Sequence, residues 1–199
     1  MAGASMKDIK LRIKSVESTM QITKAMELVA SSKLRKAKER QERCRPYFMG
    51  LKQTLESIET ATNDFSSPYQ QQREIKKRCL IVIAGDRGLA GGYNSNVFKS
   101  VQPMLEEGSV CVLPIGKRTV DFFARNGIEM LTTEFAEAAS VSVSDCFTIS
   151  NLITKGYLNG QYDEVSVVYT RFVSMLTQTP AHDVLLPLEK LEGKAETGV

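Results

Sequence analysis

One apolar heptad repeat runs through the first sixty residues and constrains the fold more than any other feature of this chain. Alternate steps of three and four residues, from position 6 to position 58, meet a polar side chain only at Thr23, Glu27 and Gln41. A repeat kept over about seven heptads predicts a helix of about 80 Å that forms a coiled coil with a partner helix. We call these positions the seam, and they are Met6, Ile9, Ile13, Val16, Met20, Thr23, Glu27, Ala30, Leu34, Ala37, Gln41, Cys44, Phe48, Leu51, Leu55 and Ile58.

The seam passes through Pro46 and continues in phase beyond it. Because proline removes one backbone hydrogen bond, we expect a kink there rather than the end of the helix. The helix is expected to stop near Thr60, before a polar stretch (63–72) that is typical of a linker. No comparable second repeat follows, so the sequence shows no partner for this helix.

After Lys77 the hydrophobic period changes. The continuous apolar run 79–84 predicts a strand buried on both faces, and helices and strands then alternate. This alternation predicts a Rossmann-like α/β domain with a mostly parallel sheet. Only a few residues join the last two strands, which are therefore expected to be antiparallel neighbours. The expected helices are 96–107, 117–126 and 144–159, and the further strands are 110–115, 128–131, 164–173 and 180–186.

Together these patterns predict an α/β chain in which a long N-terminal coiled-coil helix precedes the α/β domain. The expected segments are a shaft helix (1–62), a central α/β domain (75–190) and a disordered tail (191–199).

Charge is distributed unevenly along the chain. The net charge is only +3, yet the first 58 residues hold 13 Lys or Arg against 6 Asp or Glu. An anionic partner is therefore expected to meet the N-terminal helix. The densest part, which we call the basic run, is Lys33, Arg35, Lys36, Lys38, Arg40, Arg43 and Arg45. A solvated helix face and contact with acidic or phosphate groups both explain it. The absence of stacking aromatics argues against nucleic acid.

A glycine-rich loop (85–92) follows the first strand of the domain. A strand, a glycine loop and a helix N-terminus form an anion cradle in many α/β proteins. Here Gly91 is followed by Gly92 and Tyr93 rather than by the Lys-Ser/Thr pair of a Walker loop, and the dinucleotide spacing is also missing. We therefore expect the loop to present Asp86 and Arg87 to a partner on a rigid turn.

No residue pattern indicates a catalytic or metal site. His182 is the only histidine and has no ligand set at suitable spacing. The four cysteines are widely spaced and are expected to be reduced, buried thiols: Cys44, Cys79, Cys111 and Cys146. We expect no cofactor, no metal and no active site carried by this chain alone. No apolar run approaches 18 residues and no signal peptide is visible.

Several motifs resemble those of the gamma subunit of F-type ATP synthase. The stretches MKDI (6–9), QITKAMELVA (21–30), KLR (33–35) and RPY (45–47) resemble its N-terminal signature. The stretch DRGLAGGYN (86–94) resembles its central glycine loop, where a cysteine often takes the place of Ala90. QTP (178–180) and LLPL (185–188) also fit, so the resemblance covers almost the whole chain.

The resemblance implies a non-catalytic rotor. In that family the N-terminal helix pairs with a long C-terminal helix, and the pair forms the shaft inside a ring of alpha and beta subunits. The central domain lies against the epsilon subunit and the ring of membrane c subunits. Ion-driven rotation of this shaft drives ATP synthesis at catalytic sites on beta.

The resemblance also assigns contact residues. Those facing the alpha/beta ring would be Ile22, Lys24, Met26 and Val29. Those approaching the c-ring and the epsilon foot would be Lys33, Arg35, Lys36, Arg40, Arg43, Tyr47, Asp86 and Arg87.

One departure from the family concerns the end of the sequence. The family's closing helix has no counterpart before Val199, so we expect a truncated chain that self-associates through its seam. The regulatory cysteine segment of plant chloroplast forms is also missing. With no transit peptide, a bacterial form at the cytoplasmic face of the inner membrane is favoured.

Two other functions are alternatives to the rotor. One is a nucleotide-binding α/β enzyme with a coiled-coil dimerisation arm, and the other is a coiled coil that binds nucleic acid through the basic run.

Overall fold

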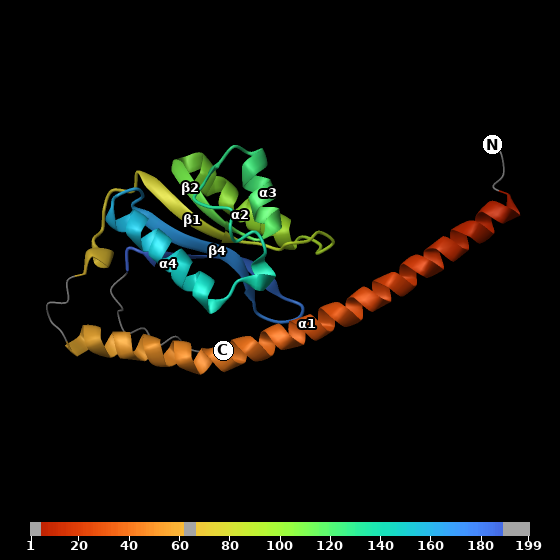
Figure 1. Cartoon of the computed structure of the whole chain (residues 1–199), viewed down its shortest axis with the longest axis horizontal. Coiled ribbons are helices and arrows are strands. Elements are labelled where there is room, and N and C mark those ends of the chain that lie inside the picture. Colours follow the sequence, from red (N-terminus) through yellow and green to blue (C-terminus); the bar gives the residue numbers. More distant parts are fainter. Residues whose placement is uncertain (1–4, 62–66, 189–199) are drawn as a thin grey trace. The chain divides into compact units, whose positions relative to one another are not determined.

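A computed structural model describes residues 5–61 and 67–188 of the chain. The chain separates into two compact units, Met1–Asn63 and Asp64–Val199. The first unit is built on one long helix and the second is an α/β domain (Figure 1). The disordered tail expected at 191–199 lies outside the described residues.

The first unit consists of helix α1 (Met6–Ala61), which has 56 residues. The hydroxyl of Ser5 accepts a hydrogen bond from the backbone N–H of Lys7 at 3.3 Å, and Asp8 lies in the first turn. Both features favour a helix start there, because they satisfy a free N–H group and complement the helix dipole. The helix does not end at Pro46 but continues through it, as the sequence predicted, and α1 forms a curved rod (Figure 1).

The second unit contains every strand and helix that the sequence predicted, with shifted ends. Helix α2 begins three residues earlier than expected, and a short 3-10 helix, η1, lies inside the stretch predicted as a linker. The elements are η1 (Pro68–Gln70), β1 (Lys77–Ile83), α2 (Tyr93–Glu107), β2 (Ser109–Ile115), α3 (Lys117–Arg125), β3 (Glu129–Met130), η2 (Ala138–Ser140), α4 (Val143–Leu158), β4 (Glu164–Phe172) and β5 (Gln178–Leu186).

The five strands form one sheet in the order β3-β2-β1-β4-β5. Strand β1 pairs in parallel with β2 and β4, β3 is parallel to β2, and β5 is antiparallel to β4. This confirms the mostly parallel sheet and the antiparallel last pair. The strand order changes direction between β1 and β4, which makes that position the topological switch point of a Rossmann-like sheet.

Helices cover both faces of the sheet (Figure 1). On one face, Val97 and Val101 of α2 and Phe123 of α3 pack against the alternate residues Leu80 and Val82 of β1. The other face packs against α4, through a core that includes Cys79, Ile81, Ile149, Ile153 and Tyr157. Strand β1 is therefore buried on both faces, as its continuous apolar run indicated.

The segment before β1 packs on the domain rather than running free as a linker. The Tyr157 hydroxyl of α4 donates to the carbonyl of Gln71 at 3.1 Å. Arg73 donates to the carbonyl of Tyr157 at 3.1 Å, and its guanidinium lies 4.8 Å from the centre of that ring. The backbone N–H of Leu188, beyond β5, donates to the carbonyl of Tyr69 at 2.7 Å. The start and the end of the described domain are thus joined.

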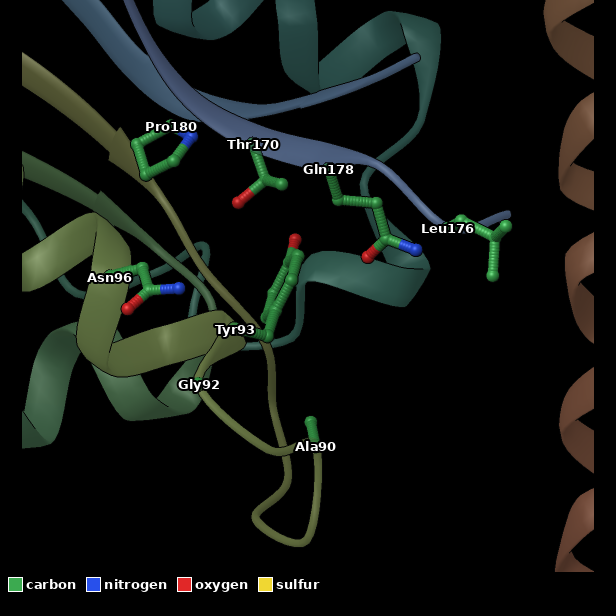
Figure 2. Close-up of a pocket in the computed structure, with 8 residues that line it drawn as sticks. All are labelled: Ala90, Gly92, Tyr93, Asn96, Thr170, Leu176, Gln178 and Pro180. Atoms are coloured by element: carbon green, nitrogen blue, oxygen red, sulfur yellow. The ribbon is translucent and has the colours of Figure 1, made fainter. Parts of the chain in front are cut away.

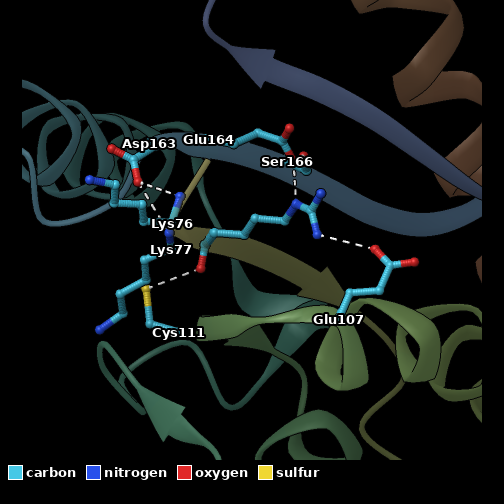
Figure 3. A network of polar contacts seen from close by, with 8 residues as sticks. Lys76, Lys77, Glu107, Cys111, Asp163, Glu164 and Ser166 are labelled. Carbon is cyan, nitrogen blue, oxygen red and sulfur yellow. Dashed lines mark hydrogen bonds and ion pairs between the residues drawn. The ribbon is translucent and has the colours of Figure 1, made fainter. Parts of the chain in front are cut away.

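Charged side chains tie the amino ends of the strands together (Figure 3). The guanidinium of Arg78 lies 3.3 Å from Glu107 and 3.3 Å from Glu164. One carboxylate oxygen of Asp163 accepts from the backbone N–H groups of Lys76 at 2.9 Å and of Lys77 at 3.1 Å. These backbone hydrogen bonds lower the pKa of Asp163, with the first the larger cause.

The expectation of four buried thiols is wrong for two of them. Cys79 and Cys111 are buried and face each other in the register of β1 and β2. The hydrogen bond with Cys111, together with burial, raises the pKa of the Cys79 thiol well above its ordinary value. Cys44 and Cys146 are exposed on α1 and α4, because helix positions that look apolar in sequence need not face a core.

Candidate partner-binding surfaces

The seam forms one side of α1, and its large apolar side chains are mostly exposed. The exposed fraction of these residues ranges from 43% at Ile9 to 70% at Met6, and only Leu34 is half-buried. Complete burial of one such side chain contributes about 1.5–3 kcal/mol. A surface of this kind along a single helix favours a second helix as its partner.

The polar position at the middle of the seam is satisfied within the helix itself. The Thr23 hydroxyl donates to the backbone carbonyl of Thr19 at 2.9 Å, and the Thr19 hydroxyl donates to the backbone carbonyl of Ser15 at 2.9 Å. Threonine commonly bonds the preceding turn in this way. Thr23 therefore leaves no unpaired donor on the seam, and its methyl group remains available for packing.

A second apolar surface lies beside the seam, and we call it the band. It consists of Ile22, Met26 and Val29, which are exposed, as is the fourth predicted ring-facing residue, Lys24. Ile22, Met26 and Val29 are spaced by four and three residues, so they lie on the same side of the helix. Lys24 lies on the same two turns of α1 but about half a turn around the helix from these three, next to Thr23 and Glu27 of the seam.

The basic run follows the band and is exposed throughout, as is Tyr47. Arg35 lies 4.0 Å from Glu39 one turn later. An exposed pair at that distance contributes little to stability. Within the described part of the chain, the other cations of the run make no ion pair. They are therefore available to an anionic partner.

The two predicted contact residues of the glycine loop, Asp86 and Arg87, lie in different environments. The carboxylate of Asp86 accepts from the backbone N–H groups of Ala138 at 2.7 Å, Ala139 at 3.2 Å and Lys117 at 3.4 Å. It therefore holds the loop to the neighbouring segments of the domain. These contacts use the Asp86 carboxylate within the domain, and its contact with a partner stays a prediction. Arg87 is exposed on the same turn.

The structure also groups residues that the sequence did not single out. A pocket of about 260 Å³ lies between the loop after β1 and the β4–β5 hairpin (Figure 2). Its residues come from two segments about eighty positions apart, and only the pairing of β1 with β4 brings these segments together. No sequence signal marked the pocket. Its lining residues are Ala90, Gly92, Tyr93, Asn96, Thr170, Leu176, Gln178 and Pro180.

The described residues contain no cluster of three or more His, Cys, Asp or Glu side chains suited to a metal ion. His182 is exposed on the edge strand β5. Within the same ranges, no helix has the length and apolar character needed to span a membrane.

Comparison with known proteins identifies the family. The sequence model described as ATP synthase matches residues 5–198. The ATP synthase gamma chain of Ruminococcus albus is 44% identical over 95% of this chain and 68% of its own length. That of Alkaliphilus metalliredigens is 45% identical over 96% of this chain and 66% of its own. The sodium ion specific gamma chain of Acetobacterium woodii is 40% identical, with 97% and 66% covered.

A solved structure agrees on the fold. A chain from the central stalk and c-ring of Tetrahymena thermophila mitochondrial ATP synthase superposes with a TM-score of 0.59 at 24% identity. The match covers 83% of this chain and 72% of that one. In sequence, the chain spans about two thirds of the length of the curated relatives that it matches. With the family model matching almost its entire length, this chain belongs to the ATP synthase gamma chain family.

Proposed function

We propose that this chain acts as the central-stalk rotor subunit of an F1Fo ATP synthase. In this role it couples ion-driven rotation of the membrane ring to ATP synthesis on the alpha/beta ring. It is non-catalytic itself, because the chemistry belongs to the beta subunits. The observation that carries the proposal is α1: a gamma-family chain devotes 56 residues to one helix whose apolar seam is exposed.

The seam and the band have different tasks in this proposal. The seam packs against a second helix, and the resulting two-helix shaft resists bending and twisting better than one helix. The band, Ile22, Met26 and Val29, lies beside the seam and remains exposed when the seam is covered. The band, together with Lys24 at the other border of the seam, therefore faces the surrounding alpha and beta subunits.

The foot of the rotor consists of the basic run, Tyr47 and the glycine loop. The exposed cations approach the c-ring and the epsilon subunit, whose contact surfaces we expect to be acidic. Arg87 contributes from the loop, while Asp86 fixes the loop from within. Contact with the membrane is then indirect, through the c-ring at the cytoplasmic face of the bacterial inner membrane.

The nucleotide-binding alternative has less physical support. A nucleotide at the glycine loop needs backbone donors and cations around its phosphates. The pocket beside the loop contains no charged side chain, and the Asp86 carboxylate lies within the loop. Calorimetry with ATP and NAD tests this alternative, and we expect no binding heat.

Reconstitution tests the rotor proposal directly. The chain is mixed with alpha and beta subunits, with and without a peptide matching the closing helix of its gamma-chain relatives. We expect co-purification with the alpha/beta ring, more complete with the peptide because it covers the seam. We also expect a change in ATPase rate compared with alpha and beta alone.

A pair of matched variants locates the contact. Met26→Asp with Val29→Asp places charge in the band and is expected to reduce co-purification at least tenfold. Gln53→Asp, an exposed change elsewhere on α1, is expected to leave it unchanged. Failure of the unmodified chain to co-assemble in either condition would contradict the rotor function.

A further inference from the structure

Two buried thiols face each other in the sheet, and the proposed rotor function uses neither of them. Cys79 of β1 and Cys111 of β2 are direct partners in the parallel register, and both belong to the core that packs against α4. Their exposed fractions are 0% and 1%. Neighbouring strands lie about 4.7–4.9 Å apart, which is inside the range of about 4.4–6.8 Å for the Cα atoms of disulfide-bonded residues. The backbone therefore already has the spacing that a disulfide bond needs.

The direct pairing favours a reversible bond. Side chains of direct partners in a parallel pair leave the sheet side by side, so their Cβ atoms are separated by about the strand spacing of 4.7–4.9 Å. The Cβ atoms of disulfide-bonded residues usually lie about 3.5–4.5 Å apart. A wider separation strains the bond and makes it easier to reduce. A disulfide between these two strands would therefore open again under reducing conditions.

The two thiols differ in how readily they ionise. Cys79 hydrogen-bonds to Cys111, which itself donates to the backbone carbonyl of Arg78 at 3.6 Å (Figure 3). The hydrogen bond from Cys79 is the largest cause that lowers the pKa of the Cys111 thiol; burial opposes it, and the ammonium of Lys77 adds to it. The same hydrogen bond raises the pKa of Cys79. Cys111 therefore forms a thiolate first, and the thiolate is the nucleophilic form of cysteine.

A charged pair crosses the sheet next to Cys111. Glu129, in the two-residue strand β3, is the direct partner of Cys111, and Lys77 precedes Cys79 by two positions on β1. The Lys77 ammonium and the Glu129 carboxylate lie 2.7 Å apart, and their side chains are 28% and 59% exposed. Partly exposed ion pairs contribute little to stability. Opening of this pair therefore gives a small oxidant a path to the sulfur of Cys111.

We propose that Cys79 and Cys111 form an oxidative modification site, which hydrogen peroxide converts to a disulfide bond. The Cys111 thiolate attacks one peroxide oxygen: the S–O bond of a sulfenic acid forms, the O–O bond breaks, and hydroxide leaves. The Cys79 thiol then attacks that sulfur, so that the S–S bond forms, the S–O bond breaks, and water leaves with the proton of Cys79. The hydroxide takes up the proton that Cys111 lost. The two thiols are thus oxidised, and the peroxide is reduced to two molecules of water.

The disulfide would constrain the part of the domain that contains the glycine loop. Positions 79 and 111 enclose both that loop (85–92) and helix α2. Oxidation therefore closes a covalent ring around these segments, and a thiol reductant opens it again. The site uses none of the contact residues of the rotor proposal, so its test needs only the isolated chain.

Mass spectrometry of the full chain tests the site in the Cys44→Ser/Cys146→Ser background, where this pair supplies the only thiols. The protein is treated with hydrogen peroxide, and the remaining thiols are alkylated in urea. We expect a product lighter by two hydrogen atoms that takes up no alkyl group and returns to the dithiol with dithiothreitol. Peptide mapping should join positions 79 and 111 within one chain. Two alkylated thiols after treatment, oxidation that dithiothreitol does not reverse, or a bond between two chains would overturn the proposal.

Single cysteine variants test the order of the two steps. Cys79→Ser should stop the reaction at a sulfenic acid on Cys111, which dimedone labels. Cys111→Ser should leave Cys79 reduced, because its thiol ionises less readily. Circular dichroism checks that both variants fold. Oxidation of Cys79 in the Cys111→Ser variant at the same rate as the pair would contradict the assignment of Cys111 as the attacking thiol.

A matched pair of glutamate variants tests the path to Cys111. Glu129→Gln breaks the ion pair with Lys77 and removes a carboxylate that opposes the thiolate, so it should speed disulfide formation about threefold. Glu74→Gln removes an exposed carboxylate that pairs with Lys76, and it should leave the rate unchanged. Equal rates in these two variants would refute the role of the charged pair.

Discussion

At the scale of single residues, Asp86 and Arg87 show how neighbours on one loop take opposite roles. Asp86 accepts three backbone hydrogen bonds, whereas Arg87 is exposed. We expect Asp86→Ala to destabilise the α/β domain by about 1–3 kcal/mol, because it leaves those donors unsatisfied. Arg87→Ala is expected to change stability by less than about 0.5 kcal/mol. Urea unfolding followed by circular dichroism measures both, and equal losses in the two variants would contradict the assignment.

The cysteines give a second test at this scale. Cys44 and Cys146 are exposed, whereas Cys79 and Cys111 are buried in adjacent strands. Cys146 should therefore react rapidly with Ellman's reagent in the native protein, Cys44 should do so wherever the seam is uncovered, and all four thiols should react in urea. The Cys44→Ser/Cys146→Ser double variant should lose the rapid phase. A rapid phase that persists in this variant would mean that the sheet core is open to solvent.

Asp163 predicts how the domain responds to acid. Its pKa is lowered in the folded state by the N–H groups of Lys76 and Lys77. The stabilisation is therefore complete above the unfolded pKa of about 3.9 and is lost as the pH falls through the folded value. We expect Asp163→Asn to be less stable than the native protein near neutral pH, and the difference to vanish in acid. Urea titrations at several pH values measure this, and a difference that grows in acid would contradict it.

At the scale of elements, the seam determines how the chain behaves alone. Isolated helices gain most of their stability from packing, and α1 buries little of its seam. We expect the chain to self-associate in sedimentation experiments. Ile13→Glu with Leu51→Glu, both on the seam, should convert it to a monomer. Leu11→Glu with Leu28→Glu, which adds the same charge away from the seam, should not. A monomeric native chain with a fully helical α1 would count against this prediction.

The sequence predicted the helices and strands well where a hydrophobic pattern repeats. It predicted less well those features that depend on contacts between distant parts of the chain. The seam revealed α1, and the apolar run at 79–84 revealed β1. The start of α2 was predicted at Asn96 but lies at Tyr93, because Asn94 bonds back to Gly85 across the glycine loop. The pocket was not predicted, since its halves meet only through the β1–β4 register. The role of Asp86 was missed for the same reason.

At the scale of the whole molecule, the two units differ in how they are stabilised. The α/β domain has two cores, one on each face of its sheet. Helix α1 has an exposed apolar side and carries the chain's positive excess, because the residues that follow it hold more Asp and Glu than Lys and Arg. One unit thus has its own core, while the other exposes an apolar surface that a partner would cover. This division suits the proposed rotor function, in which the chain works inside an assembly.

The central position of β1 has a consequence for amide hydrogen exchange. Its residues 79–82 are buried and lie between β2 and β4, so their amides should exchange only when the whole domain unfolds. Amides of α1 should exchange through local opening until a partner covers the seam. In deuterium-exchange mass spectrometry, peptides from β1 then report the stability of the domain, whereas peptides from α1 report the degree of assembly. One sample thus reports two independent exchange rates, and only the rate of the α1 peptides should fall when a ring of partner subunits assembles around the helix.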